Sequence, residues 1–236
     1  MNLKIRSELD KELNTLRDML YRMEGLVSES LQRAVVSLKK RDAELAQQVI
    51  RDDDAVNRLR WEIEQYCVNV IATQQPVATD LRMILAVVHI AVELERMGDH
   101  AAGVAKVTLE ICDESLLKPL IDLPRMAEIA IEMVHEGVRA FINGDAEVAH
   151  SIIERDDDVD ALHNQIFREL ITYMLEDPST IRRATHLLWA SHAVERFADR
   201  ATNIAERILF VTSGRLEDLT SESTEAGITP DEACEV

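Results

Sequence analysis

An internal repeat constrains the fold of this chain more than any other feature. The residues ERMGD at positions 95–99 return as ERFAD at positions 195–199. In each copy a glutamate and an aspartate lie four residues apart, so on a helix they share one face, a turn apart. Packing alone would preserve only apolar positions. The preserved charges therefore indicate a function, and two carboxylates at this separation are suited to holding one hard cation.

The repeat extends well beyond this motif. Residues 50–59 align with residues 153–162, and the two halves differ in length only between the segments 74–80 and 176–180. Each of these segments contains a proline, which places a turn there. The pattern of apolar residues then predicts three helices in each half. They span about 3–39, 42–73 and 79–112 in the first half. In the second half they span about 122–143, then from 145 to the turn at 176–180, and then 179–213.

These helices predict an all-α fold of two tandem antiparallel three-helix bundles, since short connections make neighbouring helices antiparallel. The expected boundaries are a first bundle at 1–115, a linker at 116–124, a second bundle at 125–215 and an acidic tail at 216–236. Asp122 is the expected N-cap of the fourth helix, and Asn143-Gly144 is its expected end. The tail lacks the apolar residues needed to offset the entropy of ordering, so we expect it to be disordered.

Charge and cysteine usage narrow the functional classes. The net charge of −18 disfavours direct binding to nucleic acid, because such a surface repels phosphate backbones. The three cysteines are odd in number and lack a Cys-x-x-Cys spacing, which is typical of a reduced intracellular protein. No apolar run is long enough to span a bilayer. We therefore expect a soluble, cytoplasmic protein.

The second helix of each half supplies further candidate ligands. Asp53 and Asn57 lie 20–24 residues before the first proline turn, and the Glu-x-x-x-Asp motif lies 18–22 residues after it. Asp156 and Asp160 stand in the same relation to the second motif. Antiparallel helices with equal rise bring positions equidistant from a turn to the same height. The sequence therefore predicts two clusters of oxygen ligands for metal ions such as Mg²⁺, Mn²⁺, Zn²⁺ or iron. Their members are Asp53, Asn57, Glu95 and Asp99 in the first half, and Asp156, Asp160, Glu195, Asp199 and Asn203 in the second.

Simpler interpretations of these residues stay open. Glu95 could pair with Arg58, and Asp99 could simply face water, in which case the acidic clusters serve only salt bridges and solubility. His163 and His192 fall near the second cluster and either join it or merely pack. On the helix at 79–112, a different and solvated face is expected to carry Arg82, His89, Glu93 and His100. Two Glu-x-x-His spacings resemble those of di-iron bundles, but neither histidine has a counterpart in the other half. We interpret those residues as surface groups: Glu132, His135, Glu147 and His150.

The duplicated segments Glu-Arg-x-Gly-Asp-His at 95–100 and Glu-Arg-x-x-Asp-x-x-x-Asn at 195–203 resemble those of the PhoU family, the regulatory proteins of phosphate-specific transport systems. The resemblance covers residues 3–215. It implies a cytoplasmic, often dimeric protein that damps the phosphate-starvation response. It also implies two partners, the transporter ATPase PstB and the sensor kinase PhoR, and multinuclear metal clusters at the acidic motifs. The first site departs from the pattern at Asn57 and Gly103, which implies weaker metal binding there.

Three functions compete at this level. The leading interpretation is a non-enzymatic regulator, because no nucleophile or proton-transfer group stands beside the carboxylates. The second is a metal-dependent enzyme on a helical bundle, such as an oxidase or a phosphate-ester hydrolase. The third is a scaffold whose acidic clusters bind no metal.

Overall fold

The fold is built from long helices. The computed structural model describes residues 3–213, which form six α-helices and one short 3₁₀ helix. The first half contains α1 (Leu3–Lys40), α2 (Ala43–Gln74) and α3 (Thr79–Ile111). The second half contains α4 (Asp122–Asn143), α5 (Glu147–Glu176), η1 (Pro178–Thr180) and α6 (Ile181–Ser213). The predicted helices are confirmed, most to within two residues, and the predicted tail at 216–236 lies outside the described residues.

The helix ends follow local chemistry. The Asp42 side chain accepts a hydrogen bond from the Leu45 backbone N–H and caps α2. Gly144 ends α4 in the left-handed conformation with φ of 71°, as the Asn-Gly pair predicts. The expectation for Asp122 was wrong. It lies inside α4 and makes no capping hydrogen bond, because its carboxylate faces Lys118 instead, 3.8 Å away.

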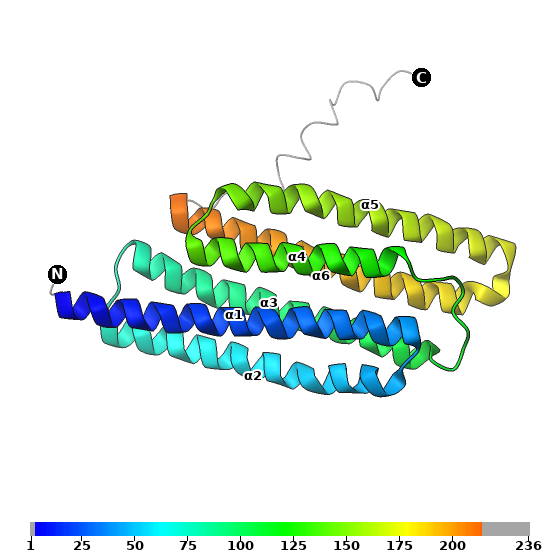
Figure 1. Ribbon diagram of the computed structural model, residues 1–236, viewed down its shortest axis with the longest axis horizontal. Coiled ribbons are helices and arrows are strands. Elements are labelled where there is room, and N and C mark those ends of the chain that lie inside the picture. The colour runs from blue at the N-terminus through cyan, green and yellow to red at the C-terminus, as the bar shows by residue number, and fades with distance from the viewer. Residues whose placement is uncertain (1–2, 214–236) are drawn as a thin grey trace, which may run out of the picture.

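The two halves are packed into one body. Figure 1 shows α1–α3 grouped along one side and α4–α6 along the other, with the axes of all six long helices nearly aligned. Contacts of α3 with α6 and of α1 with α4 join the halves, whereas α2 and α5 lie on opposite outer edges and do not touch. One continuous apolar core runs through both halves. None of the described helices combines the length and the apolar character needed to cross a membrane.

The apolar core determines the direction in which the side chains of the repeated motif point. Met97 and Phe197, the central residues of the two motifs, are completely buried. Residues two positions away on a helix point in a very different direction, so the flanking acidic residues face away from the core of each bundle. The helices α2 and α5 each bury an apolar stripe too, formed by Val56, Leu59, Ile63 and Val70 on α2 and by Val159, Leu162, Ile166 and Leu170 on α5. These stripes set the rotation of α2 and α5 against α3 and α6.

Candidate functional site

The first acidic cluster forms between α2 and α3. Asn57 donates a hydrogen bond of 3.1 Å from Nδ2 to Oδ2 of Asp53. The other oxygen of Asp53 is buried and has no hydrogen-bond partner among the described residues. Burial, and then the charge of Asp99, raises the pKa of both Asp53 and Glu95. The structure therefore brings together the four residues predicted from the heights of the helices.

Nearby cations partly compensate the first cluster, Arg60 first, with smaller contributions from Arg96 and Lys106. Arg60, which stands over the ring of Trp61 at 4.5 Å, opposes the rise in the pKa of Glu95. The suggested alternative partner of Glu95, Arg58, is exposed instead. Position 60 lies three residues after Asn57 and seven after Asp53, so it shares their face of α2, whereas position 58 does not. Asp99 is exposed, as the simpler interpretation allowed, but its charge still acts on its two neighbours.

The second cluster forms in the same way between α5 and α6, with more negative charge. Burial raises the pKa of Asp156 to about 7, and the charges of Asp199, Asp160 and Glu195 add to this rise. Burial and Glu195 also raise the pKa of Asp160 and of Asp199. One oxygen of Asp156 is buried and has no hydrogen-bond partner within residues 3–213, like the equivalent oxygen of Asp53 in the first half. The repeat has thus kept the same unpartnered oxygen twice.

Two histidines border the second cluster. His192 Nδ1 lies 2.8 Å from Oε2 of Glu195. His163 shares a hydrogen bond of 2.8 Å with the buried hydroxyl of Ser191, and the two imidazole rings are 6.1 Å apart. The repeat places Arg60 and Val92 at the positions equivalent to these histidines. The second cluster therefore has two imidazoles where the first has a guanidinium and an apolar side chain.

The two clusters flank the contact between α3 and α6. Glu93 on α3 meets Asn203 and Arg200 on α6, and further along a side chain added at Gly103 would meet Ala193. These pairs show that α3 and α6 run antiparallel, so the two Glu-x-x-x-Asp motifs lie alongside one another on neighbouring helices.

This contact engages Asn203 and corrects one expectation. Asn203 donates a hydrogen bond of 3.0 Å from Nδ2 to Oε2 of Glu93, and its role as an oxygen ligand of the second cluster stays a prediction. Glu93 and His100 were expected on a solvated face, yet both are half-buried at the α3–α6 contact. Burial and the nearby Arg200 and Arg196 lower the pKa of His100 to about 4. The sequence contains one indication that this face is not solvated: the residue equivalent to Glu93 in the second half is Ala193, a small apolar residue.

The carboxylates of each cluster are near enough to raise one another's pKa, but their side chains do not converge on one point. In residues 3–213 no group of three or more His, Cys, Asp or Glu side chains is arranged so that it could hold a metal ion. The four residues of the Glu-x-x-His spacings are all exposed, as expected. Carboxylates that raise one another's pKa and leave buried oxygens unpartnered carry uncompensated charge. The donor set, all oxygen in the first cluster and oxygen with imidazole in the second, fits divalent cations.

The chain is similar to proteins of known name over most of its length. The PhoU domain model matches twice, at residues 20–108 and 123–208. The phosphate-specific transport system accessory protein PhoU homolog of Aquifex aeolicus is 42% identical over 209 residues, covering 89% of this chain and 95% of the relative. The crystal structure of PhoU from Pseudomonas aeruginosa superposes with a TM-score of 0.82 at 36% identity, covering 87% of this chain and 99% of that one. The phosphate transport system regulatory protein PhoU from Streptococcus pneumoniae gives a TM-score of 0.83 at 32% identity, over 89% and 100% of the two chains.

Proposed function

This chain belongs to the PhoU family, and from that premise we propose that it is a cytoplasmic negative regulator of phosphate uptake and of phosphate-starvation signalling. Its relatives are named accessory or regulatory proteins of the phosphate-specific transport system, which favours a regulator over an enzyme. The proposed partners are the transporter ATPase PstB, the sensor kinase PhoR and a second copy of the chain. It reaches the membrane through the first two.

Metal binding at both acidic clusters is the second part of the proposal. The observation that carries it is the unpartnered buried oxygen of Asp53 and its repeat counterpart on Asp156, each beside a Glu-x-x-x-Asp pair. Without a cation, the carboxylates of a cluster repel one another and stay apart. A divalent cation would draw them together and offset the cost of the buried, unpartnered oxygens. Zinc, iron, manganese and magnesium all suit such donors.

The two clusters have different metal preferences in this proposal. Imidazole nitrogen favours zinc and iron over magnesium, and both His163 and His192 border the second cluster. The first cluster has only oxygen donors, and Arg60 already offsets part of its charge. We therefore assign the tighter transition-metal site to Asp156, Asp160, Glu195 and Asp199, with an adjacent imidazole. The first cluster is the weaker site.

Co-purification tests the regulatory role. The full chain, tagged, is recovered from cells grown in high and in low phosphate, and PstB and PhoR are quantified in the eluate. We expect both partners, in amounts that change with phosphate. A fourfold variant, Glu95→Gln, Asp99→Asn, Glu195→Gln and Asp199→Asn, should lose that phosphate dependence, and Glu154→Gln, an exposed position, should retain it.

The outcomes separate the two parts of the proposal. Recovery of neither partner would contradict the regulatory role. Recovery of both partners with an unchanged phosphate response in the fourfold variant would contradict a role for the acidic clusters in signalling. Loss of metal in the variant, measured by elemental analysis, is a separate readout that tests metal binding directly.

A further inference from the structure

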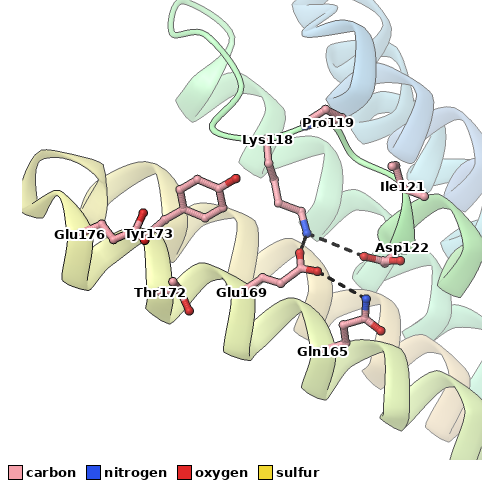
Figure 2. A pocket seen from close by; sticks show the side chains of 9 residues that line it. All are labelled: Lys118, Pro119, Ile121, Asp122, Gln165, Glu169, Thr172, Tyr173 and Glu176. Carbon is pink, nitrogen blue, oxygen red and sulfur yellow. Dashed lines mark hydrogen bonds and ion pairs between the residues drawn. The ribbon is translucent and has the colours of Figure 1, made fainter.

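A cavity of about 600 Å³ lies between the interdomain linker and the last turns of α5, away from both acidic clusters. Figure 2 shows the linker residues Lys118, Pro119 and Ile121 along one side and the side chains of α5 along the other. Position 169, the nearest charged lining residue on α5, is roughly 14 Å along the helix from Asp160. The volume falls in the range of sites that bind small molecules or a few residues of a peptide.

A buried lysine forms the wall of this cavity on the linker side. The Lys118 side chain is only 11% exposed and its ammonium group forms ion pairs with Glu169 and Asp122. Gln165 donates a further hydrogen bond to Glu169, and Figure 2 shows the four side chains as one connected group. These contacts hold the linker against α5, so the cavity is a built feature of the fold.

The cavity keeps a negative charge after this pairing. Three carboxylates line it, on Asp122, Glu169 and Glu176, against the single ammonium of Lys118. Glu176 is exposed and is the last residue of α5, whose final turn contains no basic side chain. A carboxylate at a helix C-terminus is unfavourable, because it adds to the negative end of the helix dipole. This end of the cavity therefore attracts a cation that the described residues do not supply.

The remaining walls suit a cation with an apolar stem. Ile121 is 70% exposed and lines the cavity together with Pro119 and the half-buried ring of Tyr173. Arginine has such a stem, which packs on apolar surface while the guanidinium stays polar, and a guanidinium binds both carboxylates and the face of a tyrosine ring. We propose that this cavity is a docking site for a basic segment of a protein partner, and that an arginine of that segment enters it between Tyr173 and Glu176.

Fluorine NMR tests the proposal on the full chain. The chain has three tyrosines, Tyr21, Tyr66 and Tyr173, so 3-fluorotyrosine labelling gives one reporter in the cavity and two elsewhere. The probe is N-acetyl-arginine methylamide, with the citrulline analogue as its uncharged match. We expect a saturable shift of the Tyr173 signal alone with the arginine probe, and none with citrulline. Tyr173→Phe assigns the signal.

Substitutions on α5 test how binding of the arginine probe depends on the charge of the cavity. Glu176→Gln should weaken binding of the arginine probe by about two- to fivefold, as expected for the loss of one exposed ion pair. Glu154→Gln, exposed on the same helix, should leave it unchanged. The proposal is overturned if the citrulline probe shifts Tyr173 equally, if Glu176→Gln has no effect, or if spermidine binds and the arginine probe does not. A Tyr173 shift that follows protein concentration alone would assign the cavity to a second copy and would also overturn it.

Discussion

The two acidic clusters come from one repeated design, yet they balance their charge differently. The first has Asn57 where the second has Asp160, and Arg60 where the second has His163. Asn57 donates to Asp53 and Arg60 opposes the charge on Glu95. The second cluster has four mutually repelling carboxylates and a pKa of about 7 at Asp156. Arg196 lies 3.7 Å from Asp199 in the second cluster, but the charges that act most strongly on Asp156 are all carboxylates. A cluster with less counter-charge gains more from a cation, so we propose that the repeat provides a weaker metal site in the first half and a stronger one in the second.

The largest expected effect tests whether the scaffold is indeed the same in both halves. Met97 and Phe197 are completely buried at equivalent positions, so Met97→Ala and Phe197→Ala should each lower the free energy of unfolding by about 3–4 kcal/mol. Chemical denaturation followed by circular dichroism measures this. If one substitution costs less than about 1 kcal/mol, the two halves do not hold their motifs in the same way and the comparison of the sites fails.

Exchanging the residues that distinguish the sites should move the metal preference. His163→Arg should weaken zinc binding at the second site by about 10- to 100-fold, because it removes an imidazole and adds a positive charge. Arg60→His should strengthen zinc binding at the first site. Calorimetric titration with zinc measures both, and His163→Gln separates the lost imidazole from the added charge. Equal zinc affinity in wild type and His163→Arg would show that the imidazole plays no part.

The difference in charge balance also predicts a pH dependence in metal-free protein. The pKa of Asp156 is about 7 in the folded chain against an ordinary 3.8. The folded chain therefore takes up this proton at a higher pH than the unfolded chain, and stability is lost as pH rises from about 4 through 7. Asp156→Asn should remove this loss and raise the free energy of unfolding at pH 8 by about 1–2 kcal/mol, allowing for solvent screening.

Asp53→Asn is the matched control for that measurement. It should have a smaller effect, because Asn57 already donates a hydrogen bond to the Asp53 carboxylate. Chemical denaturation at pH 5 and pH 8 in the presence of a chelator gives the free energy of unfolding of wild type and of both variants. An Asp156→Asn protein with the same pH dependence as wild type would show that the carboxylates of the second cluster do not repel one another in solution.

The smallest expected effect concerns the glycine of the first motif. A methyl group added at Gly98 would lie 2.7 Å from Oδ1 of Asp53, whereas the second motif has Ala198 at this position. Asp53 can turn aside at little cost, so Gly98→Ala should stabilise the helix by up to about 1 kcal/mol while weakening metal binding at the first site. Gly25→Ala, where no atom lies within 4 Å, should bring the same stability without touching either site. A lower stability for Gly98→Ala would show that Asp53 is held rigidly.

Much of this arrangement could be predicted from the sequence, because it depends on local rules. The constant rise of a helix and the two proline turns were enough to bring Asp53 to Glu95 and Asp156 to Glu195. The packing of one half on the other depends on contacts between residues more than one hundred positions apart, for which the sequence has no local signal. Glu93 and His100 were misplaced for that reason. Arg60 was missed in favour of Arg58, although its spacing from Asp53 and Asn57 already places it on their face of the helix.

Metal retention tests the central claim most directly. Wild type, Glu95→Gln/Asp99→Asn and Glu195→Gln/Asp199→Asn are loaded with zinc and dialysed against buffers of decreasing free zinc, and the zinc per chain is measured by elemental analysis. We expect the zinc that wild type retains at the lowest free zinc to be retained by Glu95→Gln/Asp99→Asn, the first-site variant. The second-site variant, Glu195→Gln/Asp199→Asn, should lose it. Retention by the second-site variant and loss by the first-site variant, or equal retention by both, would contradict it.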